Sequence, residues 1–126
     1  MENLYTEFED IAVFRFIYIG EAHPADSSSP VSYAEEKGIM THKDYDDRCS
    51  VCRSFIDDEG LTIPAVVDTF DNATNRAYLG FPARVFLVRK DGTLGIAGEK
   101  GPEGVRPALT AVREWLTEYR DTGVER

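Results

Sequence analysis

The sequence is poor in the residues that carry metal chemistry or covalent cross-links. Its 126 residues include two cysteines, two histidines and one tryptophan. Two cysteines cannot form the disulfide framework of a small secreted domain, and a chain of this length can bury a core without one. Four ligands at zinc-binding spacing are not available either, so we predict no metal site.

Positive charge and long apolar runs are also scarce. The chain has 14 Lys and Arg against 23 Asp and Glu, a formal net charge of −9. This charge opposes binding to nucleic-acid phosphates and to anionic membrane surfaces. No apolar run approaches the roughly 18 residues of a membrane span, and the acidic start MENLYTEFED is unlike a signal peptide. We therefore expect a cytoplasmic protein that binds neither nucleic acid nor membrane.

Strand and helix patterns alternate along the chain. The Lys90-Asp91-Gly92 turn predicts a hairpin between the last two strands. Alternating strands and helices predict an α/β fold with a mostly parallel sheet, a C-terminal antiparallel hairpin and flanking helices, in one domain over residues 1–126. The predicted strands are residues 12–19, 63–67, 84–89 and 93–97.

Two helices carry the strongest periodicity. The first is Asp44–Glu59, which Asp44 can cap and Gly60 can end. The last begins near Pro107. Weaker helical signals lie at residues 3–10 and 71–78. One apolar face is predicted on each main helix: Tyr45, Cys49, Cys52 and Ile56 on the first, and Val105, Leu109, Val112, Leu116 and Tyr119 on the last.

Glu21 and His23 directly follow the first predicted strand. Polar residues at this place lie where open α/β sheets hold ligands. Two positions apart in an extended segment, the two side chains would point the same way, and a carboxylate beside an imidazole suits proton transfer. From the residues alone, the simpler interpretation is a loop histidine that bonds a nearby backbone carbonyl.

Cys49 and Cys52 form a Cys-x-x-Cys pair, a spacing found in redox sites. The pair lies in the middle of a predicted helix on its apolar face, however. Free cysteines at such positions often act as small buried hydrophobes. Both interpretations stay open at this point.

Two stretches resemble known families. Residues 81–92, Phe-Pro-Ala-Arg-Val-Phe-Leu-Val-Arg-Lys-Asp-Gly, resemble the cis-proline, strand and turn of the thioredoxin superfamily. The resemblance implies a cis Pro82 that presents backbone to a substrate, although an ordinary trans proline can also begin a strand. Residues 18–26, Tyr-Ile-Gly-Glu-Ala-His-Pro-Ala-Asp, are very similar to the motif after a central strand in the iodothyronine deiodinases.

Further matches to the deiodinases follow in the same order, from about residue 4 to residue 119. They are His42 before Asp47-Arg48-Cys49, Val67-Asp68, Asp71-Asn72, Ala77-Tyr78, Arg84-Val85, Gly98 with Lys100-Gly101-Pro102, and Val112-Arg113-Glu114-Trp115-Leu116. Each match alone has low specificity, but the shared order and spacing make the whole set specific. The resemblance thus implies a thioredoxin-like fold over nearly the whole chain.

The resemblance also implies a nucleophile that this sequence does not contain. In the family, a selenocysteine or cysteine begins the helix before the Glu-Ala-His-Pro strand, and Met1 falls inside that helix. We therefore expect a domain that is N-terminally incomplete, lacking the first strand and part of the first helix. An uncovered apolar edge would follow, which predicts poor expression or a homodimer.

The activity that the resemblance implies is reductive dehalogenation, or related thiol or selenol redox chemistry. His23 would donate a proton, while Glu21, His42 and Arg84 would hold an aromatic or peroxide-type small molecule. Arginine suits that task because its planar fork binds a carboxylate. From the residues alone, the simpler interpretation is that Arg84 is an exposed strand-end charge and that His42 is a residue just ahead of a helix.

The same resemblance implies no bound cofactor, with an external thiol as reductant. Cys49 matches a family cysteine thought to resolve the oxidised nucleophile, while Cys52 has no recognised counterpart and is a candidate redox partner only through the Cys-x-x-Cys spacing. Two alternatives remain: a non-catalytic thioredoxin-like ligand-binding domain, and a dithiol redox protein that uses Cys49 and Cys52.

The expected upstream nucleophile can be tested on DNA. A UGA codon for selenocysteine reads as a stop, so gene finding would start at the next Met codon. We expect an in-frame UGA or Cys codon followed by a Pro codon shortly upstream of Met1. Genomic sequencing of this region checks the prediction, and a frame without such a codon contradicts it.

Overall fold

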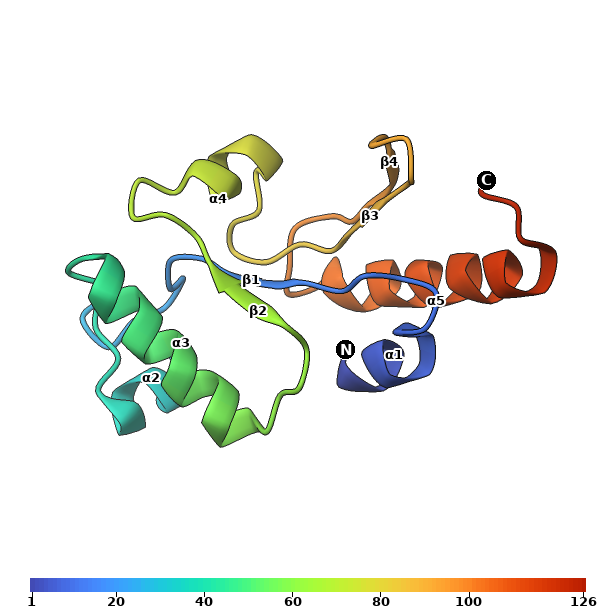
Figure 1. The fold of residues 1–126 in the computed structure, drawn as a ribbon. Helices are drawn as coiled ribbons and strands as arrows, with labels where there is room; N and C mark the ends of the chain where they lie inside the picture. The colour runs from blue at the N-terminus through green and yellow to red at the C-terminus, as the bar shows by residue number, and fades with distance from the viewer. The chain divides into compact units, whose positions relative to one another are not determined.

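The computed structural model describes residues 1–126, which form two compact units. One consists of residues 1–14 and 80–126 and the other of residues 15–79. Each unit combines helices with a two-stranded sheet (Figure 1). The predicted α/β class, with a parallel pair of strands and a C-terminal antiparallel hairpin, is confirmed and fits a thioredoxin-like fold.

The unit of residues 15–79 is built on two parallel strands, β1 (Phe16–Tyr18) and β2 (Ala65–Val67). Phe16 of β1 pairs with Ala65 of β2, and Tyr18 pairs with Val67. Phe55 of helix α3 stacks on Phe16 with ring centroids 6.0 Å apart and lies 6.4 Å from the ring of Tyr18. These aromatic contacts fasten α3 to the sheet. The elements are β1 (Phe16–Tyr18), α2 (Ser32–Lys37), α3 (Tyr45–Glu59), β2 (Ala65–Val67) and α4 (Ala73–Tyr78).

Both strands and one helix of this unit differ from prediction. The strands cover residues 16–18 and 65–67 where 12–19 and 63–67 were predicted, because they face each other over only three residue pairs. Helix α2 was not predicted at all. It is six residues long and buries only Ala34, so its sequence shows no apolar period.

Helix α3 begins and ends where the sequence predicts. The Asp44 side chain accepts a hydrogen bond from the Asp47 N–H at 2.8 Å, and Gly60 ends the helix with φ +62°. The predicted apolar face is wrong in detail, because Tyr45 is 46% exposed and Cys49 only half-buried. Cys52 is buried as predicted, and Arg48 is the buried residue that the predicted face leaves out.

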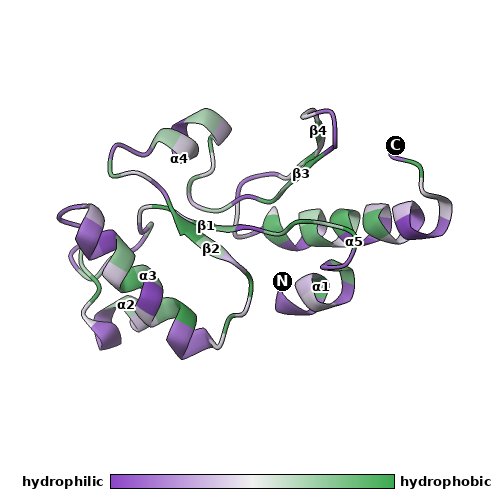
Figure 2. Ribbon diagram, in the orientation of Figure 1, coloured by the Kyte–Doolittle hydropathy of each residue, from purple (hydrophilic) through white to green (hydrophobic).

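The other unit packs helices α1 and α5 with a hairpin. The hairpin turns at Gly92, where φ is +86° and the Arg89 N–H donates to the Thr93 carbonyl at 2.8 Å. Apolar positions recur along α5 (Figure 2). The elements are α1 (Glu2–Phe8), β3 (Phe86–Val88), β4 (Leu94–Ala97) and α5 (Val105–Thr122). The core of this unit consists of Leu4, Phe8, Leu87, Val112, Trp115 and Leu116.

The buried carboxylate of Asp68 organises the chain after β2. It accepts backbone hydrogen bonds from Thr69, Thr74 and Asn75, each at 2.9 Å, and thereby holds the first turn of α4. Burial by itself would raise the pKa of Asp68, but the backbone N–H donors outweigh burial and hold this pKa below its ordinary value. The folded state therefore favours the ionised carboxylate.

We predict that Asp68→Asn lowers the free energy of unfolding by about 1–3 kcal/mol at pH 7, because a neutral amide replaces a charged acceptor. The folded pKa is depressed, so the contribution is present above the unfolded pKa of about 4 and is lost as pH falls through the folded value. Urea unfolding of wild type and variant from pH 7 to pH 3 checks this, with Glu36→Gln on exposed helix α2 as control. If the difference in the free energy of unfolding between wild type and Asp68→Asn stays constant with pH, the prediction is contradicted.

Candidate functional site

The carboxyl ends of β1 and β2 lie side by side. The Asp68 N–H donates to the Tyr18 carbonyl at 2.8 Å, which extends the pairing one residue past β2. Gly20 and Glu21 follow one strand, and Asp68 and Thr69 follow the other. This is the place where parallel α/β sheets hold their ligands.

Tyr18 and Glu21 are joined at this edge. The Tyr18 hydroxyl donates to the Glu21 Oε1 carboxylate oxygen. Burial raises the pKa of Tyr18 well above its ordinary value, and the hydrogen bond and charge of Glu21 raise it further. Tyr18 therefore stays a neutral donor, and it positions the carboxylate of a predicted ligand-binding residue.

His42 lies buried beside this pair, with only 7% of its surface exposed. Its ring centroid is 5.7 Å from that of Tyr18. Its Nδ1 atom accepts a hydrogen bond from Arg48 Nε at 3.1 Å, and its Nε2 atom is buried without a partner. Burial and the Arg48 charge lower the pKa of His42, while the charges of Glu21 and Asp47 oppose this only in part. His42 is therefore neutral at pH 7.

Arg48 is the residue of this cluster to which sequence analysis assigns no role. Its side chain is buried, and Nη1 donates to the Thr69 carbonyl at 2.7 Å and to the Asp68 carbonyl at 3.4 Å. The guanidinium carbon lies 5.6 Å from the ring centroid of Phe70. A methyl group added at Gly20 would sit 3.6 Å from Nη2, so the guanidinium reaches the ends of both strands.

A signal for Arg48 was present in the sequence. Arg48 lies four residues before Cys52, so both project from the same side of an α-helix. Because Cys52 is predicted to be buried, an arginine on the same side of the helix is predicted to be buried as well and to need hydrogen-bond acceptors. Because the acceptors are carbonyls twenty residues away, the sequence pattern alone could not identify them.

The structure does not bring Glu21 and His23 together in the predicted way. Ala22 and His23 form a bend, so the spacing of two residues does not align their side chains as it would in an extended strand. The His23 side chain is exposed, while its carbonyl accepts a hydrogen bond from the Val31 N–H at 3.3 Å. The predicted alignment is wrong, and the proton-donor role of His23 stays a prediction.

The two cysteines are free thiols in unlike surroundings. Cys49 is half-buried, and its hydrogen bonding with Tyr45 raises the pKa of the Tyr45 hydroxyl. Cys52 is buried, and burial raises its pKa, with a further contribution from Cys49. Because the thiolate is the reactive form, Cys52 is a poor nucleophile in the folded protein.

Arg84 and Pro82 belong to the unit of residues 1–14 and 80–126. The Phe81–Pro82 peptide bond is cis, as predicted, and the Gly101–Pro102 bond is cis as well. Arg84 Nε donates to the Gly98 carbonyl at 2.6 Å, and its guanidinium carbon lies 4.7 Å from the Phe86 ring centroid. The predicted ligand-binding roles of both residues stay predictions.

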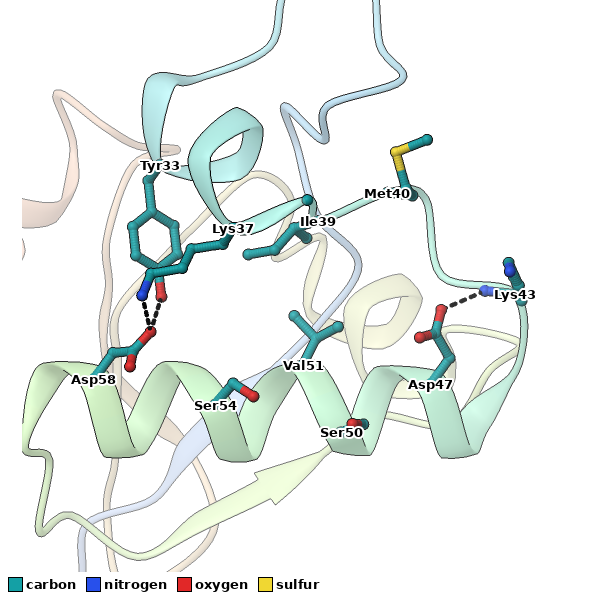
Figure 3. A pocket seen from close by; sticks show the side chains of 11 residues that line it. Tyr33, Lys37, Ile39, Met40, Lys43, Asp47, Ser50, Val51, Ser54 and Asp58 are labelled. Carbon is teal, nitrogen blue, oxygen red and sulfur yellow. Dashed lines mark hydrogen bonds and ion pairs between the residues drawn. The ribbon is translucent and has the colours of Figure 1, made fainter.

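A pocket of about 430 Å³ lies between α2 and α3 in the unit of residues 15–79 (Figure 3). Asp58 receives a hydrogen bond from Tyr33 at 3.0 Å and an ion pair from Lys37 at 3.2 Å, so these charged groups satisfy one another. None of the predicted site residues lines this pocket. Nowhere in the chain do three His, Cys, Asp or Glu side chains gather as a metal ion would require.

Comparison with known proteins gives a consistent result. The family model described as iodothyronine deiodinase matches residues 1–120. The chain is 34% identical to a thyroxine 5-deiodinase of Sparus aurata, covering 95% of this chain and 43% of that enzyme. It is 34% identical to a type II iodothyronine deiodinase of Neoceratodus forsteri, over 97% and 46% of the two chains, and 32% identical to a type I enzyme of Xenopus laevis, over 83% and 40%.

The chain therefore spans less than half the length of the curated relatives it matches. No helix in the structure has both the length and the apolar character that crossing a bilayer demands.

The unequal burial of the two thiols generates a prediction. We expect iodoacetamide to alkylate Cys49 in the native protein and to reach Cys52 only after unfolding, because Cys52 is 3% exposed and its pKa is raised. Mass spectrometry of peptides from native and urea-treated protein measures both sites. Equal rates of alkylation at Cys49 and Cys52 in the native protein would contradict this prediction and support the dithiol interpretation.

Proposed function

Because the chain belongs to the iodothyronine deiodinase family, we propose that it contributes the ligand-binding and proton-donating part of a deiodinase-like oxidoreductase. The observation that carries the proposal is the cluster at the carboxyl ends of β1 and β2. There, Glu21 and His42 present a carboxylate and a neutral imidazole from one edge of the sheet.

The proposed reaction is the two-electron reduction of a carbon–iodine bond in an iodinated aromatic ligand. A selenolate or thiolate from a segment upstream of residue 1 attacks iodine and forms a selenium–iodine or sulfur–iodine bond. The electron pair of the broken bond remains on carbon, where a proton from His23 completes the carbon–hydrogen bond. Two thiols then release iodide, regenerate the nucleophile and leave as a disulfide, so no bound cofactor is needed.

Glu21 and His42 are proposed to hold the ligand, whereas the ligand-binding roles of Arg84 and Pro82, which belong to the other unit, stay predictions. The Tyr18 hydroxyl supports this by occupying one oxygen of Glu21 and leaving the other for a ligand donor. Cys49 is proposed as the internal thiol of the regeneration step, since it is half-buried rather than enclosed like Cys52. A small external thiol can take its place.

We predict that the chain extended upstream through the expected nucleophile releases iodide from thyroxine in the presence of dithiothreitol, while residues 1–126 alone do not. His23→Gln in the extended chain should lower kcat by about 100-fold or more, because a general acid typically contributes that much. Iodide release measures both effects, with Glu36→Gln as a variant of an exposed charge outside the cluster.

Three outcomes separate the parts of this proposal. Iodide release by residues 1–126 alone would contradict an upstream nucleophile. Unchanged kcat in His23→Gln would contradict the proton-donor role. Thyroxine binding without iodide release by the extended chain would favour a non-catalytic ligand-binding domain.

A further inference from the structure

His42 Nε2 is the buried side-chain nitrogen or oxygen that lacks a hydrogen-bond partner in this structure. A buried polar atom left unpaired costs about 1–3 kcal/mol, so native proteins rarely keep one without a purpose. The neighbouring Tyr18 hydroxyl does not satisfy it, because that hydroxyl donates to Glu21. The position of Nε2 in the candidate site points to a partner that arrives with the ligand.

The chemistry of Arg48 determines which kind of partner fits. Arginine Nε carries a hydrogen and can only donate, so His42 Nδ1 must offer its lone pair in the 3.1 Å contact. In a neutral imidazole, the other nitrogen then carries the hydrogen. Nε2 is therefore a donor, and it seeks an acceptor.

Arg48 also opposes the other states of the ring. Protonated His42 would direct an Nδ1 hydrogen at a donor and place two cations in contact, and burial disfavours the charge as well. In the neutral tautomer with the hydrogen on Nδ1, that hydrogen would face the hydrogen of Arg48 Nε, and the hydrogen bond between them could not form. Arg48 cannot turn away at low cost, because Thr69 and Asp68 carbonyls at the end of β2 hold its Nη1.

We propose that Arg48 is a positioning residue that locks His42 as a permanent neutral Nε2–H donor. The ligand-holding role of His42 and the iodinated aromatic ligand are taken from the proposed function, and the lock adds that this donor requires an oxygen acceptor on the ligand, such as a phenol hydroxyl or phenolate. The inference rests on the proposed function only in assigning the ligand to this site. Its physical basis is the Arg48–His42 hydrogen bond and the unpaired Nε2.

The tautomer can be observed directly, because the chain has only two histidines. Long-range ¹H–¹⁵N correlation spectra of residues 1–126, assigned with His42→Gln, should show His42 neutral with Nε2 protonated at pH 7.5. Arg48→Gln should give a mixture of tautomers, since an amide can either donate or accept. Arg53→Gln, at an exposed position of the same helix, should leave the spectrum unchanged.

Ligand selection is tested with 2,6-diiodophenol against 1,3-diiodobenzene, which has the same two iodines without the oxygen. The phenol should shift the His42 Nε2 resonance, and Arg48→Gln should weaken its affinity about tenfold, the equivalent of one hydrogen bond. Affinity for diiodobenzene should be the same in both proteins. Circular dichroism of each variant verifies its fold.

The inference is overturned by an Nδ1–H or charged His42 in the wild-type spectrum, an outcome that remains decisive even if Arg48→Gln fails to fold. It is also overturned if the phenol leaves Nε2 unshifted, or if Arg48→Gln weakens both compounds equally. Failure of the extended chain to deiodinate thyroxine, with these results intact, would overturn the proposed reaction and leave the role of Arg48 standing.

Discussion

The candidate site depends on a buried guanidinium at the carboxyl ends of two parallel strands. Arg48 bonds the carbonyls of Asp68 and Thr69 after β2, lies beside Gly20 after β1 and donates to His42. A buried cation is costly unless its donors find acceptors, and here three neutral acceptors bond the Nε and Nη1 groups of Arg48. The Arg48 contacts thus tie α3, both strand ends and the imidazole into one network.

The network holds two of its titratable groups, Tyr18 and His42, in their neutral forms. Tyr18 stays protonated because burial and Glu21 raise its pKa, and His42 stays uncharged because burial and Arg48 lower its own. The net charge of −9 would otherwise favour protonation of an exposed imidazole. The cluster therefore combines the Glu21 carboxylate, an acceptor, with the neutral His42 imidazole.

Local features of the fold were predictable because neighbouring residues cause them. The Asp44 side chain caps α3 by accepting a hydrogen bond from the N–H of Asp47, three residues later, and Gly60 ends the helix. Gly92 supplies the positive φ of the hairpin turn. The extent of β1 was not predictable, because strand length depends on how many residues of β2 face it. On α3, the burial of Cys52 was predicted but that of Arg48 was not, because its acceptors are carbonyls distant in the sequence that a hydrophobicity pattern does not reveal.

The sequence by itself determined the order of strands and helices, the family and the residues available for chemistry, because these depend on short-range pattern and on residue identity. Only the tertiary structure decided which of those residues meet. It placed Tyr18 on Glu21 and Arg48 on His42, buried Cys52, and turned His23 outward at a bend. Burial and the direction of a hydrogen bond arise from groups far apart in the chain, so no local spacing encodes them.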